Sequence, residues 1–78
     1  MLHILFLGRL EDLVGKAELK VTFTPTLGDL FANFDDAIGE ALQSAPIRLA
    51  INGKLEHDRN AALRDGDEIA FFPPVSGG

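Results

Sequence analysis

The sequence has no cysteine, and phenylalanine, with six copies, is its only aromatic residue. Without cysteine the chain has neither disulfides nor thiolate metal sites, so its stability must come from an apolar core. Apolar residues make up 46% of the 78 residues. A single domain of this size, residues 1–78, buries only about 60% of the surface that its unfolded chain exposes.

Long hydrophobic runs and clustered positive charge are also missing. No apolar run approaches the ~20 residues of a membrane-spanning helix, and Met1–Ile4 lacks the basic start of a secretory signal. We therefore expect a cytoplasmic protein with no membrane contact. Seven basic against twelve acidic residues give a net charge of −5. Nucleic-acid binding, which needs clustered Lys and Arg, is not expected, and a basic protein partner is favoured.

Side chains that carry chemistry form no recognisable group. His3 and His57 are far apart, and neither serine has an obvious paired base. Asp35-Asp36 and Asp65-Gly66-Asp67 are better explained as a helix start and a tight turn than as a metal site. The sequence therefore supports no enzyme pocket, no metal site and no bound cofactor.

The first and last apolar segments predict the middle of a sheet. Leu2–Leu7 and Glu68–Phe72 are apolar on both faces, as expected for strands that are covered on both sides or lie centrally. Between them, Glu18–Thr24 alternates. This pattern predicts a strand with Leu19, Val21 and Phe23 inward and Glu18, Lys20 and Thr22 outward.

Local signals place the remaining elements. Leu10–Val14 predicts a short helical turn ended by Gly15, and Thr26 with Asp29 has the spacing of a capping box. The helix after Thr26 has an apolar stripe, Leu27, Leu30, Phe31 and Phe34, and a second helix is predicted from about Asp35 to Ser44. A strand is predicted for Ile47–Ile51 and a type I′ turn for Asn52-Gly53, after which Lys54-Leu55 forms a return strand. A loop or helical turn is predicted at Asn60–Leu63. The fold class is α+β, a mixed sheet with its terminal strands central and a helix packed on one face.

The end of the chain has the clearest functional pattern. Pro73-Pro74 favours an extended chain, and six residues from Pro73 reach at most about 20 Å. Gly77 and Gly78 have no side chains, so a terminal carboxylate can enter a narrow channel. We predict an extended tail, 73–78, that delivers the Gly78 carboxyl group to another protein's active site; a frayed terminus is the alternative.

The segment Leu63–Gly78, LRDGDEIAFFPPVSGG, resembles the C-terminal signature of the small subunits of molybdopterin synthase. These proteins are ubiquitin-like sulfur carriers of the β-grasp fold, and the resemblance in length and element order covers the whole chain. Leu2–Leu7 fits their first strand, and Ser76 stands where Thr is also common.

The resemblance implies a mechanism. An E1-like adenylating enzyme uses ATP to adenylate Gly78, and sulfur from a persulfide donor displaces AMP to leave a thiocarboxylate. The tail then enters the large catalytic subunit, within a heterotetramer, and donates sulfur to cyclic pyranopterin monophosphate to build the dithiolene of molybdopterin. The chain binds no cofactor itself and is not catalytic alone; it is the sulfur-donating subunit of a sulfurtransferase.

Partner binding needs a surface as well as a tail. If Phe6, Val21, Leu30 and Ile69 face the helix, alternation sends Leu5, Leu7, Ala70 and Phe72 to the opposite face, where Leu55 joins them. Phe72 is the expected main anchor, because aromatic residues dominate interface hot spots. The predicted partner-binding residues are Leu7, Leu55, Phe72, Pro73, Pro74, Val75 and Ser76.

Two other functions remain open. Sulfur carriers for thiamin thiazole synthesis are similar in fold and diglycine end but usually lack the Phe-Phe-Pro-Pro run. A ubiquitin-like modifier attached to lysines of target proteins has the same kind of terminus, and the sequence hardly distinguishes it.

Overall fold

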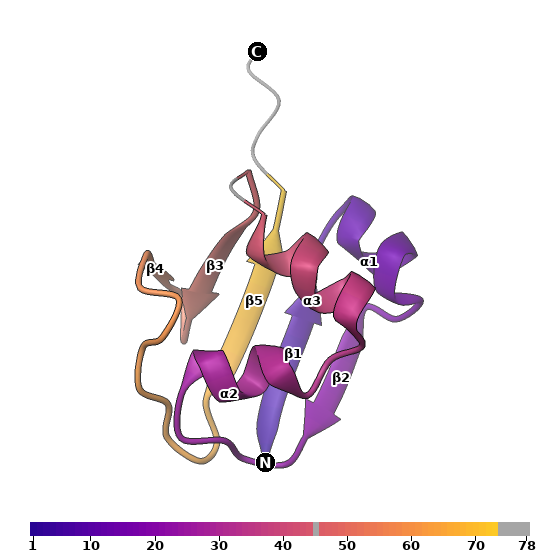
Figure 1. The fold of residues 1–78 in the computed structure, drawn as a ribbon. Helices are drawn as coiled ribbons and strands as arrows, with labels where there is room; N and C mark the ends of the chain where they lie inside the picture. Colours follow the sequence, from indigo (N-terminus) through magenta and orange to yellow (C-terminus); the bar gives the residue numbers. More distant parts are fainter. Residues whose placement is uncertain (45, 74–78) are drawn as a thin grey trace.

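The computed structural model describes residues 1–44 and 46–73, which form one mixed sheet with helices beside it (Figure 1). The elements, in chain order, are β1 (Leu2–Phe6), α1 (Arg9–Val14), β2 (Glu18–Val21), α2 (Leu27–Ala32), α3 (Asp36–Gln43), β3 (Arg48–Ile51), β4 (Lys54–Glu56) and β5 (Glu68–Phe72).

The sheet has the order β2-β1-β5-β3-β4. The central pair, β1 and β5, is parallel, with Ile4 opposite Ile69, and every other neighbouring pair is antiparallel. The two ends of the sequence thus meet in the middle of the sheet. The predicted β-grasp fold, a mixed sheet with central terminal strands, is confirmed.

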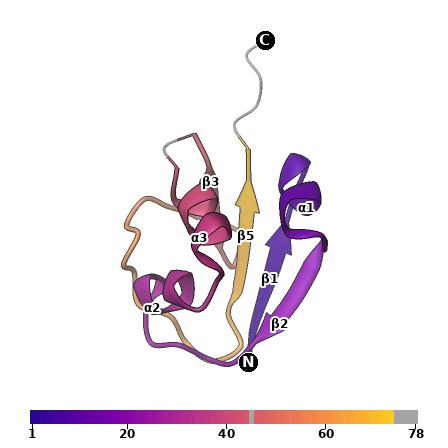
Figure 2. The ribbon, with the colours of Figure 1, turned by 45° about the vertical axis from the view of Figure 1, so that its right-hand side comes forward.

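Helices α2 and α3 lie on the same face of the sheet, as both views show (Figures 1 and 2). The predicted helix layer therefore consists of two short helices, and α1 stands at the end of β1. Within residues 1–44 and 46–73 no helix covers the opposite face, which we call the open face. The two-faced apolar pattern of β1 and β5 reflects a central position, not coverage on both sides.

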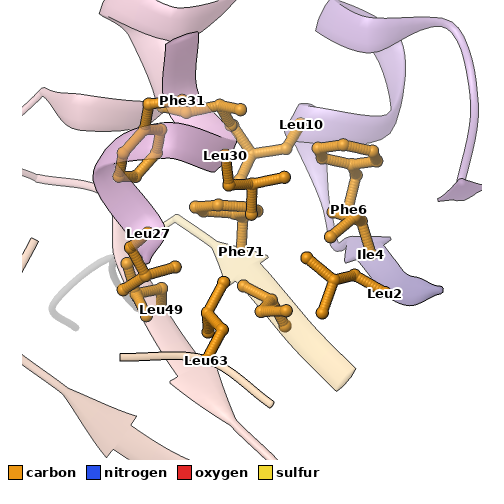
Figure 3. Close-up of a cluster of buried hydrophobic side chains, with 12 residues drawn as sticks. Leu2, Ile4, Phe6, Leu10, Leu27, Leu30, Phe31, Leu49, Leu63 and Phe71 are labelled. Atoms are coloured by element: carbon orange, nitrogen blue, oxygen red, sulfur yellow. The ribbon is translucent and has the colours of Figure 1, made fainter. Parts of the chain in front are cut away.

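The core is a cluster of leucine, isoleucine and phenylalanine between the helices and the sheet (Figure 3). Phe71 stacks on Phe6, with ring centroids 6.0 Å apart, and lies 5.8 Å from the ring of Phe31. Phe34 meets Phe6 edge-on at 6.2 Å. Such aromatic pairs contribute about 0.5–1.5 kcal/mol each beyond the area that they bury. They join α2, and the link that follows it, to the two central strands.

Both helix starts follow the predicted caps. The hydroxyl of Thr26 accepts a hydrogen bond from the Asp29 amide at 3.2 Å and donates one to the Asp29 carboxylate at 3.0 Å. The Asp35 carboxylate accepts one from the Ala37 amide at 2.9 Å. These side chains satisfy backbone donors that have no partner inside the helix. The stripe prediction is right for Leu27, Leu30 and Phe31, but α2 ends at Ala32, so Phe34 lies in the link to α3.

The second strand is shorter than predicted, and one of its inward positions is wrong. Strand β2 ends at Val21, and Phe23 is 38% exposed instead of inward. Thr24 is buried in its place and donates a hydrogen bond to the Thr26 carbonyl at 3.1 Å. The alternation of apolar and polar residues continues past Val21, but β1 has no residue there for β2 to pair with. Without pairing, the alternation no longer indicates which way the side chains point.

The predicted turns form where expected. Gly15 ends α1 in the left-handed conformation, and Asn52 and Gly53 have φ angles of 51° and 84°. In the Asp65-Gly66-Asp67 turn, a hydrogen bond from the amino terminus, reinforced by its positive charge, holds the pKa of the exposed Asp65 carboxyl below its usual value. Asn60–Leu63 is a loop, joined to the start of α2 by the bridge between Ala62 and Thr26.

Asn52 is a structural link as well as a turn residue. Its amide side chain donates to Asp67 at 2.8 Å and accepts from the Glu68 amide at 3.0 Å, which fastens the β3–β4 turn to the start of β5. Asn52→Ala is expected to lower the free energy of unfolding by about 1–3 kcal/mol, through lost hydrogen bonds and a strained positive φ. Urea denaturation measures this change.

The control is Asn52→Gly, which loses the same hydrogen bonds but accepts the positive φ. We expect it to be less destabilised than Asn52→Ala. An alanine variant as stable as the wild type would contradict the linking role of Asn52.

Candidate functional site

The open face has an apolar row that crosses four strands. The strand registers place Leu5 beside Ala70, Ala70 beside Ala50, and Ala50 beside Leu55. Residues in register point to the same face, and this face is opposite to the buried Ile69 and Phe71. Leu55, at the edge of the sheet, is 57% exposed.

Phe72 lies on the same face, one pleat closer to the end of β5. Its ring is half-buried, and its neighbour across the β3–β5 pair is Arg48, an exposed residue. Leu7, which follows β1 directly, is 47% exposed. We call Leu5, Leu7, Ala50, Leu55, Ala70 and Phe72 the open-face patch. Apolar groups gathered on one face of so small a domain indicate a contact surface.

The base of the predicted tail is anchored on two sides. The Leu7 amide donates a hydrogen bond to the Phe71 carbonyl at 2.9 Å, and Phe72 pairs with Arg48. The Pro73 ring lies against Gly8, where an added Cβ would come within 3.2 Å of Pro73 Cγ. Gly8 has a φ of 59°, which suits a residue without a side chain. The chain is thus held in a defined position up to Pro73.

The other end of the open face is charged. His3 has Lys20 on one side and Glu68 on the other, and its Nε2 lies 3.0 Å from a carboxylate oxygen of Glu18. The apolar patch lies toward the end of β5, where Arg48 is the charged residue beside it. The apolar residues of the face thus gather toward the end from which the tail departs.

The structure places three of the predicted partner-binding residues, Leu7, Leu55 and Phe72, on this face, and Pro73 at its end. Pro74, Val75, Ser76, Gly77 and Gly78 lie outside the described residues, so their predicted roles stay predictions. The sequence reasoning missed Ala50 and Arg48. Alternation counted back from the Asn52-Gly53 turn would have placed both on the open face.

Within residues 1–44 and 46–73, no three His, Asp or Glu side chains lie close enough together to hold a metal ion. No helix in the same ranges is both long and apolar enough to cross a membrane.

Comparison with protein-family models gives a match to the ThiS family over residues 4–78. The molybdopterin synthase sulfur carrier subunit of Escherichia coli (strain K12) is 37% identical, and that of Haemophilus influenzae (strain Rd) is 33% identical. Each alignment spans 82 positions and covers 100% of both chains.

Solved structures show the same architecture. SAMP1 from Haloferax volcanii is 27% identical with a TM-score of 0.76, and the match covers 99% of this chain and 98% of that one. A complex of subunits 1 and 2 of the molybdopterin-converting factor from Helicobacter pylori 26695 contains a chain that is 26% identical, with a TM-score of 0.73 and coverage of 99% and 97%.

Proposed function

Because this chain belongs to the ThiS family, we propose that it is the sulfur carrier subunit of a molybdopterin synthase. The observation that carries the proposal is the full-length similarity, at 33–37% identity, to two proteins of that name. The open-face patch at the end of β5 is consistent with a protein that docks on a larger partner and presents its C-terminal segment to it.

The Gly78 carboxyl group is the proposed sulfur carrier. A carboxylate is a poor electrophile, so an E1-like enzyme first converts it with ATP into an acyl adenylate and releases pyrophosphate. The outer sulfur of a persulfide then displaces AMP. A thiol cleaves the resulting acyl disulfide, which leaves a thiocarboxylate on Gly78 and a disulfide on the thiol's side.

The large catalytic subunit is the proposed acceptor of the tail. Its pocket receives the thiocarboxylate, whose sulfur attacks cyclic pyranopterin monophosphate. The Helicobacter pylori complex, which joins two subunits of a molybdopterin-converting factor, supports a partner of this kind. In this scheme the open-face patch supplies docking energy, and the two glycines supply a terminus narrow enough for the pocket.

The test is reconstitution with a candidate adenylating enzyme, ATP and a persulfide donor, followed by intact-protein mass spectrometry. We expect a mass increase equal to exchange of one oxygen for one sulfur, confined to the C-terminal peptide. Addition of the large subunit and cyclic pyranopterin monophosphate should then yield dithiolene product and restore the carboxylate. Sulfur loading without dithiolene formation, but with product from a thiazole synthase, would redirect the proposal to thiamin synthesis.

A second candidate function is protein modification. It is favoured by the similarity to SAMP1, whose name stands for small archaeal modifier protein 1. Lysine conjugation would use the same acyl adenylate but transfer the chain itself instead of sulfur. Isopeptide-linked adducts that end in Gly78 on target lysines, seen in tryptic peptides of cell lysate, would support it.

A further inference from the structure

A groove of about 290 Å³ lies between α2 and α3, on the helix side of the molecule. Phe34, which is half-buried, is among its lining residues, and α3 supplies two carboxylates, Asp36 and Glu40. We call this feature the α2–α3 groove. The two helices cover the face of the sheet opposite to the open face (Figure 2), so the groove and the open-face patch point away from each other.

Gly39 keeps the two helices close at this groove. A Cβ at Gly39 would lie 3.3 Å from the Phe31 carbonyl oxygen, tighter than most such contacts. Glycine in the middle of a helix is unfavourable relative to alanine, so the close approach of α3 to α2 accounts for this residue. The groove is thus a built feature of the helix pair.

Both charged side chains that line the groove are acidic. From Val21 to Ile47 the sequence contains no Lys, Arg or His but four carboxylates. Asp29 and Asp35 serve as caps. Asp36 and Glu40 remain, exposed and one turn apart on α3, and in the described residues neither forms an ion pair.

This arrangement has a local cost. Like charges four residues apart on a helix repel each other, and the positive end of the helix dipole favours Asp36 more than Glu40, because the effect fades beyond the first turn. A cation bound between the two carboxylates would remove the repulsion. The ring of the half-buried Phe34, which lines the same groove, is a group that attracts cations as well.

We propose that the α2–α3 groove is a docking site for a basic segment of a partner protein, with one arginine side chain laid over Phe34 between Asp36 and Glu40. Arginine fits better than lysine, because its planar guanidinium stacks on rings and bonds to two carboxylates at once. The net charge of −5 would steer such a segment toward the protein. This site does not depend on the proposed function, and both faces can be occupied together.

The experiment is an amide NMR titration of the ¹⁵N-labelled full chain with an acetylated, amidated tetra-arginine peptide at physiological salt. We expect saturable shifts centred on α2, α3 and Phe34. The double variant D36N/E40Q should bind roughly fivefold more weakly or worse, as expected for the loss of two exposed ion pairs. The matched control E11Q/D12N removes the same charge from α1 and should change the affinity by less than about twofold.

Two further arms complete the test. Phe34→Leu keeps an apolar side chain but removes the aromatic face, and should weaken peptide binding; tetra-lysine should bind less tightly than tetra-arginine. Amide signals that keep their wild-type positions away from the substituted side chains show that each variant is folded. The proposal would be overturned if the α1 and α3 double variants lost the same amount of peptide affinity, or if the amide shifts spread over all acidic elements. Either result would mean that the peptide binds by general charge attraction.

Discussion

Deletion of Gly78 is expected to abolish sulfur transfer while leaving the fold intact. Removal of one residue draws the terminal carboxylate back by about 3.5 Å, and a misplacement of about 1 Å at a reacting centre already costs on the order of a hundredfold in rate. The variant still ends in glycine, so the chemical nature of the terminus is unchanged. The described core ends at Phe71, and the unfolding temperature should not change.

The matched variant carries one extra glycine after Gly78, which moves the carboxylate the same distance forward. Both variants should fail in the dithiolene assay. Thiocarboxylate introduced chemically on each variant bypasses adenylation and isolates the step at the large subunit. Full activity of the shortened chain in that assay would rule out Gly78 as the reacting residue.

Replacement of Phe72 by alanine is expected to weaken binding of the large subunit by about tenfold or more, the usual effect of losing an aromatic hot spot. Phe72 lies on the open face between the apolar row and the base of the tail, and its ring is only half-buried in the free protein. Docking would cover the rest. Isothermal titration calorimetry with the large subunit measures the change.

Phe23→Ala is the matched control, because Phe23 is also a partly exposed phenylalanine, at 38%, but lies in the link between β2 and α2. It should leave the affinity unchanged. Leu55→Ala, at the far end of the apolar row, should produce a smaller loss than Phe72→Ala. If Phe72→Ala and Phe23→Ala bind the large subunit equally well, the open-face patch is not the docking surface.

The two expected effects separate docking from reaction. Phe72 acts before chemistry and changes affinity, whereas Gly78 is the reacting group and changes rate. Gly78, the reacting end, is the sixth residue after Phe72, the docking anchor, and an extended chain spans at most about 20 Å over that length. A partner pocket deeper than that span would not be reached from a surface centred on Phe72.

Signals that act within a few residues could be interpreted from the sequence alone. The Thr26 and Asp35 caps, the Asn52-Gly53 turn and the limits of β5 formed as predicted, because each depends on backbone groups close by in the chain. Phe23 is the instructive exception. The alternation that placed it inward is a property of a paired strand, and β2 has no partner beyond Val21.

The sequence by itself determined the elements, the identity of the central strands and the nature of the last six residues, since these follow from apolar periodicity, proline geometry and the absence of side chains. Alternation also predicted which residues share a face, but only the tertiary structure decided which of them become direct neighbours. The parallel pairing of β1 with β5 brings Leu5 beside Ala70, and antiparallel pairing extends this row to Ala50 and Leu55. The groove beside Asp36 and Glu40 likewise exists only because α3 packs against α2. Surfaces are made by long-range contacts, whose register depends on packing of the whole core and not on any local stretch of chain.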